Sequence, residues 1–253
     1  MHQLLIAKYT LIELIKKRLI YLHVLGVLFC CSIAGYAAGL VLTDKQATMA
    51  AFYSFLVRLF TVAVLSAYII LTEMRGLEPD NAQNWLSLSL SRRRYLLEKL
   101  LAYAGLAIFF AVLAAVPLLW IASAPLWQWL LGLLCELVIV LSLALLLSIL
   151  FRQPIVGLTV FAVIYLFSRG SAEFFRHSSN VLANSNSIFE QAIAWFVKTS
   201  TYLVPKLEWF APADWFLHSE FIVPHWGSVL TQTLVYSVLL LLIALERLLR
   251  REF

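Results

Sequence analysis

Long runs of apolar side chains, bounded by charged or turn-forming residues, recur along the whole chain. Most of these runs have about 18–25 residues, which is the length that a helix needs to cross a hydrocarbon core of roughly 30 Å. The composition agrees, because 62% of the 253 residues are hydrophobic and only 13% are charged, too few charges to cover a soluble domain. The chain is therefore predicted to be an all-α polytopic membrane protein, since β-barrel strands would be shorter and would alternate in polarity.

Six transmembrane helices are predicted, over residues 19–42, 53–72, 99–122, 126–150, 154–168 and 229–247. The fifth span is short, and it could continue to about residue 174. The first is too long for the core of a cleavable signal sequence, so it is expected to remain as an anchor. Residues 1–253 thus form a single transmembrane domain.

The basic residues collect on one side of these spans. Cytoplasmic loops of membrane proteins carry an excess of lysine and arginine. The basic residues of this side are Lys8, Lys16, Lys17, Arg18, Arg75, Arg92, Arg93, Arg94, Lys99, Arg152, Arg247, Arg250 and Arg251. Both termini are therefore predicted to be cytoplasmic, and this asymmetry explains the net charge of +5 without nucleic-acid binding. Arg58, on the other side, is expected near the outer interface with its side chain reaching the headgroups.

The loop between the second and third spans, residues 73–98, contains a predicted short helix outside the membrane. Asp80 follows a proline and precedes Gln83 by three residues, a variant of the capping box that begins a helix. Trp85 and Leu86, three and four residues after Ala82, lie with it on one face of that helix. Anchoring by positive charge explains the arginines that follow, but an apolar face displayed in the cytoplasm indicates docking to a partner protein.

The end of this loop resembles a motif of the membrane subunits of ABC-2 type ABC transporters. In that family the loop begins with an acidic and a basic residue, forms a coupling helix and ends in a pattern like Ser-Pro-Ile-Ser-Arg, with a lysine seven residues after the arginine. The corresponding residues here are Glu73, Arg75, Leu88-Ser89-Leu90-Ser91-Arg92 and Lys99. The sequence departs from the family pattern at Ser89, where proline is usual, and at Glu98, where glycine is usual.

Local signals add detail to this region. Ser91 is a natural N-cap for the third helix, and Arg92 to Arg94 are expected at the level of the phosphate headgroups. Arg94 and Glu98 are four residues apart and can pair. Pro154 suits the first turn of the fifth helix.

The resemblance implies a half-transporter of six helices, of the ABC-2 or type V exporter kind. Residues 1–18, whose polar and apolar side chains fall on opposite helical faces, match the interfacial connecting helix of that family. The residues implied to couple the chain to an ATPase are Glu73, Arg75, Asp80, Trp85, Leu86, Ser91, Arg92 and Lys99. The implied location is the bacterial cytoplasmic (inner) membrane.

The implied partners are two copies of a cytoplasmic ATP-binding-cassette ATPase, a second copy of this chain (a homodimer) or a related permease, and membrane lipids. The sequence contains no GxxxxGK[ST] motif, so ATP and Mg²⁺ are expected on the separate ATPase, with no cofactor in this chain. No nucleic-acid partner is expected.

Glu136 is the residue that is most costly to place in a membrane. It lies ten residues into the fourth predicted span, about 15 Å from its outer end. A carboxylate at this depth costs on the order of 2.5–3.5 kcal/mol, so it should face protein or water. It could hold helices together, or it could contact substrate or act as a proton-linked switch.

The loop over residues 169–228 is the largest region outside the predicted spans, and it is rich in aromatic residues. Tryptophan and tyrosine at this density indicate short helices at the outer headgroup layer, or a roof over the exit of a transport path. The polar segment 177–187 is expected to be mobile. Asp214 and His218 are four apart, but spacing this loose is common by chance, so no metal site is predicted.

Three functions compete at this point. The first is an exporter for a lipid-like or amphipathic substrate. The second is a non-transporting signal or mechanical relay built on the same fold. The third is an intramembrane serine protease, but the Gly-Ser pairs at 170–171 and 227–228 lie at outer helix ends without a histidine at matching depth, and an enzyme is therefore not expected.

Overall fold

The computed structural model describes residues 18–41, 44–77, 91–121, 126–184, 187–210, 216 and 226–250. Every regular element in these ranges is a helix: α2 (Leu19–Gly39), α3 (Lys45–Gly76), α5 (Arg92–Ala115), α6 (Leu118–Ile121), α7 (Leu126–Leu150), α8 (Pro154–Arg169), α9 (Ser171–Asn184), α10 (Ile188–Leu203), the 3₁₀ turn η1 (Leu207–Phe210) and α11 (Trp226–Arg250).

Five of these helices, with α6 counted as the end of α5, are long and apolar enough to cross a membrane. The pair α8 and α9 adds a sixth span if it is counted as one, although it is bent by 67°. The prediction of an all-helical membrane protein is confirmed at this level. The predicted interfacial helix over residues 1–18 lies almost wholly outside the described residues.

Two helices extend furthest beyond the predicted spans. α3 begins at Lys45, eight residues before the predicted span 53–72, and continues through Gly76. α5 begins at Arg92, seven residues before the predicted 99. Hydropathy identifies the part of a helix that contacts lipid. The helix itself can continue beyond that part until a capping or helix-breaking residue ends it. Residues 73–76 and 92–98, which were assigned to the cytoplasmic loop, are therefore helical.

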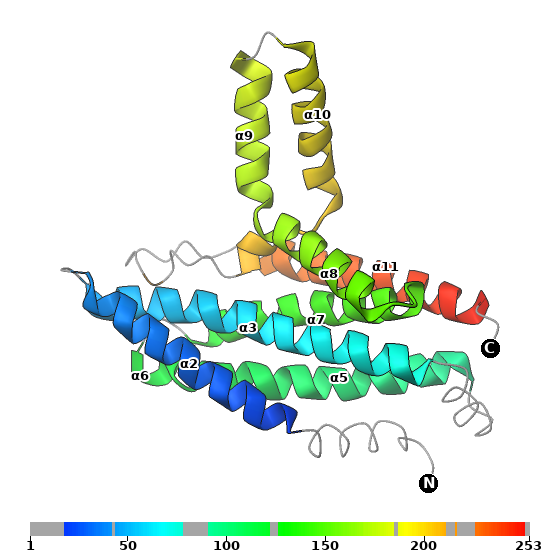
Figure 1. Ribbon diagram of the computed structural model, residues 1–253, viewed down its shortest axis with the longest axis horizontal. Helices are drawn as coiled ribbons and strands as arrows, with labels where there is room; N and C mark the ends of the chain where they lie inside the picture. The colour runs from blue at the N-terminus through cyan, green and yellow to red at the C-terminus, as the bar shows by residue number, and fades with distance from the viewer. Residues whose placement is uncertain are drawn as a thin grey trace.

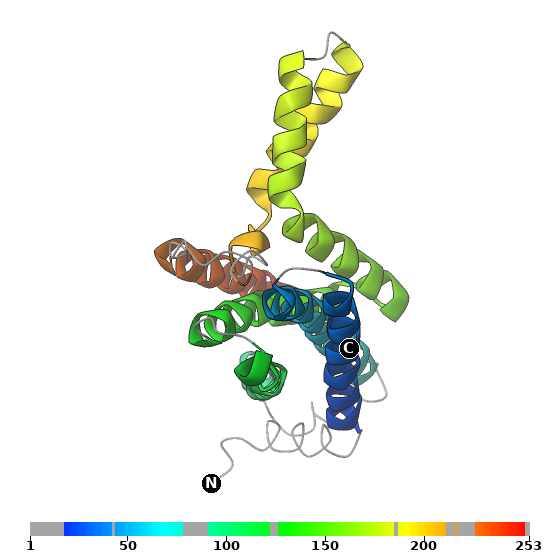
Figure 2. The ribbon, with the colours of Figure 1, turned by 90° about the vertical axis from the view of Figure 1, so that its left-hand side faces the viewer.

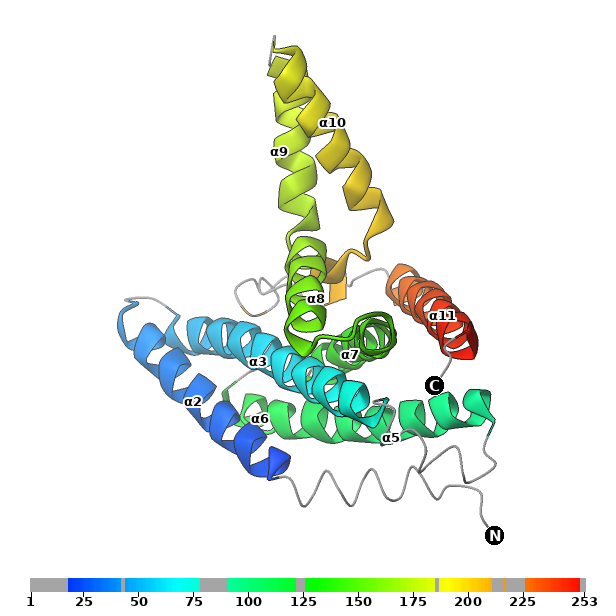
Figure 3. The ribbon, with the colours of Figure 1, turned by 45° about the vertical axis from the view of Figure 1, so that its right-hand side comes forward.

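α7 lies at the centre of the helical bundle. It contacts α3, α5, α8 and α11, and these helices surround it in Figure 3. Its sequence is apolar on all sides, as expected for a helix that faces protein all round. On α5, the small residues Ala107, Ala111 and Ala114 are buried and permit close helix packing. α2 packs against α3 at the edge of the bundle.

α8 is too short to cross a membrane by itself. Its first turn contains Pro154, as predicted. Its 16 residues correspond to about 24 Å, less than the roughly 30 Å of a hydrocarbon core. The helix ends at Arg169 beside the bundle. Gly170 follows, and the chain then bends sharply into α9.

α9 and α10 form a helical hairpin that projects from the bundle, across the direction of α3, α7 and α11 (Figures 1 and 2). Several large apolar side chains of α10 are exposed, among them Phe189, Trp195 and Phe196. The prediction of short helices in the 169–228 loop is confirmed, and their position at the outer headgroup layer stays a prediction. α9 continues to Asn184, so the first part of segment 177–187 is helical, and its mobility stays a prediction.

Candidate functional site

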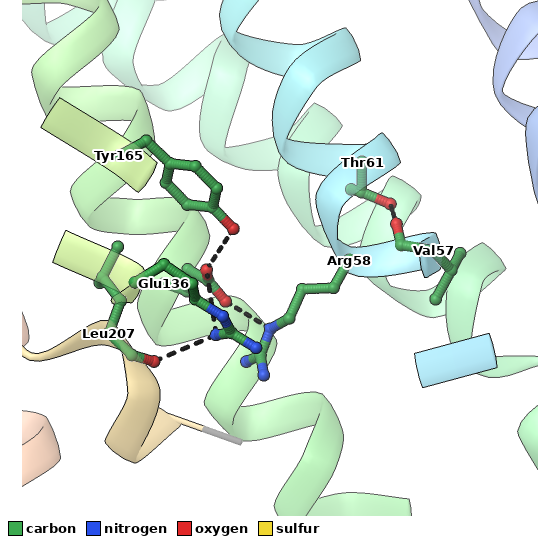
Figure 4. Close-up of polar contacts among 7 residues, drawn as sticks. Val57, Arg58, Thr61, Glu136, Tyr165 and Leu207 are labelled. Atoms are coloured by element: carbon green, nitrogen blue, oxygen red, sulfur yellow. Dashed lines mark hydrogen bonds and ion pairs between the residues drawn. The ribbon is translucent and has the colours of Figure 1, made fainter. Parts of the chain in front are cut away.

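Glu136 of α7 is the centre of a buried cluster of charges, the outer cluster (Figure 4). Its carboxylate forms an ion pair with Arg58 of α3. The hydroxyl of Tyr165, on α8, donates a hydrogen bond of 2.8 Å to Oε1 of Glu136. Arg169, at the end of α8, places Nη1 3.6 Å from the same oxygen. The expectation that Glu136 faces protein is confirmed, because its side chain is fully buried.

The position expected for Arg58 was wrong. It is 1% exposed and points to Glu136 (Figure 4), whereas the sequence placed it at the outer interface with its side chain in the headgroups. The reason is the true start of α3 at Lys45. Arg58 is thirteen residues into that helix, about 20 Å from its beginning, so a carboxylate inside the protein is closer than the headgroups.

The turn η1 closes the outer cluster on one side. Arg169 Nη1 donates to the carbonyl oxygen of Leu207 at 3.1 Å. The backbone of Phe210 lies so close to α7 that a Cβ on Gly132 would overlap its carbonyl oxygen. The neighbouring Trp129 is 2% exposed. The cluster is therefore enclosed by α3, α7, α8 and η1.

The outer cluster carries two cations and one carboxylate in the described part of the chain, namely Arg58, Arg169 and Glu136. A buried arginine is stable only while it keeps an anionic or hydrogen-bonding partner. The arrangement can therefore act as a lock between helices, since any movement of α8 away from α7 must give Arg169 a new partner.

Glu73 of α3 is the centre of a second buried cluster, the inner cluster, and its partners among the described residues come from α5. Lys99 Nζ lies 2.9 Å from Glu73 Oε1. The hydroxyl of Tyr95 donates to Glu73 Oε2 at 2.9 Å, and the hydroxyl of Tyr103 donates to Oε1. Tyr95, Lys99 and Tyr103 are spaced by four residues, so they share one face of α5. The last turn of α3 is therefore fixed to the first turns of α5.

Three more of the residues that the family resemblance singled out lie at the ends of α3 and α5 that carry the inner cluster, namely Arg75, Ser91 and Arg92. Ser91 caps α5 as predicted and accepts a hydrogen bond from Arg94 N at 3.4 Å. Arg92 Nη1 donates to the carbonyl oxygens of Leu248 and Leu249, at 2.8 and 2.9 Å, so its guanidinium binds the end of α11 and is not directed to the headgroups alone.

Arg75 is exposed on the last turn of α3. The predicted pair of Arg94 with Glu98 is present, with 2.9 Å between Nε and Oε1. Asp80, Trp85 and Leu86, the predicted docking helix, lie outside the described residues.

Sequence reasoning missed four residues of the two clusters: Tyr95, Tyr103, Tyr165 and Arg169. A signal for them was present, because tyrosine and a cation are four residues apart in both α5 and α8, at 95–99 and 165–169. Such pairs lie on one helical face. The partnership of Arg58 with Glu136 could also have been proposed, since ionisable residues within spans usually pair with one another.

In the described residues no group of three or more His, Cys, Asp or Glu could hold a metal ion. Asp214, His218 and His225 lie outside the described part of the chain. A scan against models of known protein families gave no match, and a search of curated proteins gave no significant match. The fold and composition define an integral membrane protein of the helical class.

Proposed function

We propose that this chain is the membrane subunit of an ATP-binding-cassette exporter, which moves a lipid-like or amphipathic substrate with energy from separate ATPase subunits. One observation carries the proposal. The buried Glu73 joins the last turn of α3 to three residues of α5, and these are the two helices that flank residues 78–90. If residues 78–90 transmit the movement of a partner, the two helices that flank them must be held together, as the contacts of Glu73 hold α3 and α5. We call these contacts the base of the segment.

The contacts around that base extend to a third helix. Arg92 at the start of α5 binds the carbonyl oxygens at the end of α11. A force on residues 78–90 would therefore act on α3, α5 and α11 together, as in the rigid-body movements that switch many proteins. α3 also carries Arg58, fifteen residues before Glu73, or about 22 Å along the helix. A single helix thus links the inner cluster to the outer cluster.

The hairpin of α9 and α10 supports the proposed class of substrate. Its exposed side chains include Ile188, Phe189 and Trp195, and it lies across the direction of the spans (Figure 1). A surface of this kind can stay in contact with an amphipathic molecule as its apolar part leaves the hydrocarbon layer. The complete transporter would contain a second copy of this chain or a related permease, since six spans make half of such an assembly.

Replacement of Trp85 tests the proposal. The truncation of an aromatic anchor at an interface commonly costs more than about 2 kcal/mol of binding. We expect Trp85→Ala in the full chain to reduce co-purification of an ATPase from the native host cell by roughly tenfold or more. The matched control is Trp120→Ala, which removes a highly exposed tryptophan of α6 at the opposite end of α5.

The outcomes separate the alternatives. If Trp85→Ala and Trp120→Ala retain the ATPase equally, the loop over residues 73–98 acts only as a positively charged anchor and the proposal fails. If the ATPase is retained by the wild type but no amphipathic lipid added to proteoliposomes changes its rate of ATP hydrolysis, the relay is favoured over the exporter.

A further inference from the structure

A cavity of about 390 Å³ lies where the base of the hairpin meets η1. Its walls include Ser171, Phe175 and Ser179 of α9, and Lys206 and Trp209 from the segment around η1. Ligand pockets in proteins typically begin at about 300 Å³. We call it the hairpin cavity. It is separate from both charge clusters, because none of their side chains lines it.

Two hydroxyl groups in the hairpin cavity lack a hydrogen-bond partner among the described residues. Ser171 is 1% exposed and its Oγ is orphaned, as is the buried Oγ of Ser179. A buried hydroxyl without a partner is costly, and such groups usually receive one from a ligand or water. Both hydroxyls can donate hydrogen bonds to an acceptor that enters the cavity.

The cavity also offers a positive charge. The ammonium group of Lys206 lies 4.8 Å from the centroid of the Trp209 ring. In the described part of the chain, no carboxylate lies within ion-pair distance of Lys206. Glu208 also lines the cavity, but its Oε2 accepts a hydrogen bond of 2.7 Å from the backbone N–H of Ala172. Arg176 also lines the cavity, but its Nη2 lies 3.1 Å from Oε1 of Glu173. Lys206 is therefore the cation without a carboxylate partner in the described residues that would meet an anionic ligand.

The remaining walls combine the aromatic rings of Phe175 and Trp209 with the polar residues Arg176, Asn180 and Thr201. Beyond them the exposed apolar side chains of α10 continue the surface away from the bundle. A ligand that fits this pattern has an anionic oxygen-rich group, which accepts hydrogen bonds from hydroxyls and a lysine, joined to an apolar chain. A phosphate headgroup on acyl chains has this chemistry, and lysine with aromatic residues is the usual protein surface at that level of a bilayer.

We propose that the hairpin cavity binds the phosphate headgroup of an anionic phospholipid, with Lys206, Ser171 and Ser179 as its ligands and Trp209 beside its glycerol region. This site is independent of the proposed transport function, because it requires neither an ATPase nor movement of the bundle. It would hold the hairpin at the membrane surface in an exporter or in a relay.

Binding of short-chain lipids to the full chain in neutral detergent tests the proposal. The probes are dihexanoyl phosphatidylglycerol, dihexanoyl phosphatidylcholine and inorganic phosphate, and native mass spectrometry measures their dissociation constants. We expect phosphatidylglycerol to bind more tightly than phosphatidylcholine. A hydrogen bond to a charged group accounts for about tenfold or more in affinity, so Lys206→Gln should weaken phosphatidylglycerol binding by about tenfold and Ser171→Ala should weaken it several-fold.

Lys45→Gln is the matched control, because it removes an exposed lysine at the start of α3, outside the cavity, and should leave the affinity unchanged. Ser179→Ala provides a second, milder variant in case Ser171→Ala impairs folding, and it should also weaken binding. If Lys206→Gln and Ser179→Ala bind phosphatidylglycerol as well as the wild type does, the site is excluded. If inorganic phosphate binds as tightly as phosphatidylglycerol, the assignment to a lipid is wrong.

Discussion

The inner and outer clusters use the same chemistry for different tasks. In each, one buried glutamate accepts a hydrogen bond from tyrosine and forms an ion pair with a cation. The inner cluster connects two helices that are neighbours along the chain, and its lysine side chain is 13% exposed. The outer cluster joins α3, α7 and α8, and the side chain of Arg58 is 2% exposed.

This difference shows how the cost of a buried charge depends on its surroundings. A lysine at the edge of a helix pair can regain water when its partner is lost, so the inner cluster can open at modest cost. A fully enclosed arginine has no such alternative. The inner cluster therefore suits a contact between α3 and α5 that breaks and reforms. The outer cluster suits a contact between α3, α7 and α8 that stays formed. Four substitutions test this contrast.

The largest effect is expected for Glu136→Gln, because it leaves the buried Arg58 and the half-buried Arg169 without a carboxylate. Removal of one partner from a buried pair costs about 3–5 kcal/mol, and we expect a loss of this size in the free energy of unfolding in mixed micelles. The double variant Arg58→Met/Glu136→Gln should be less destabilised than Glu136→Gln alone. Strictly additive losses would contradict the coupling between the two residues.

A smaller loss of stability is expected for Gly132→Ala, which disturbs the packing of η1 against α7 beside the outer cluster. The new methyl group would overlap the carbonyl oxygen of Phe210, and overpacking typically costs about 1–3 kcal/mol. Thermal unfolding of the purified chain measures the loss. Gly105→Ala is the control, since a Cβ there has no atom within 4 Å and alanine favours a helix. Equal melting temperatures for the two variants would show that η1 does not press on α7.

Lys99→Met should destabilise the chain by about 1–2 kcal/mol, less than Glu136→Gln, because Tyr95 and Tyr103 still donate hydrogen bonds to Glu73. The free energy of unfolding in mixed micelles measures this loss. The variant should also loosen the joint between α3 and α5, which amide hydrogen exchange in the first turns of α5 would detect as faster exchange. A destabilisation as large as that of Glu136→Gln would remove the distinction between the two clusters.

The smallest effect is expected for Glu246→Gln on α11. Glu246 Oε1 lies 2.6 Å from Arg250 Nη2, and the two side chains are 59% and 75% exposed. Exposed pairs at this spacing contribute less than about 0.5 kcal/mol. The melting temperature should stay within error of the wild type, and it should depend on salt no more than the wild type does. A clear loss would show that this end of α11 is less accessible to water than its exposure indicates.

The sequence by itself determined the class of protein and the positions of most spans. A continuous apolar run that crosses lipid must hydrogen-bond its own backbone, which a helix does within the segment. Local signals such as Ser91 and Pro154 act on the helices that they begin. The sequence also required Glu136 to face protein or water, because that requirement depends only on the cost of a carboxylate in hydrocarbon.

Only the tertiary structure decided which residues meet Glu136 and where the hairpin points. Arg58, Glu136 and Arg169 are far apart in the sequence, and their meeting depends on how α3, α7 and α8 pack. Hydropathy could not predict that α3 begins at Lys45, because a helix is stopped by its capping residues and its packing rather than by the edge of an apolar run. The direction of α9 and α10 likewise follows from the bend after Arg169, which is set by contacts between distant parts of the chain.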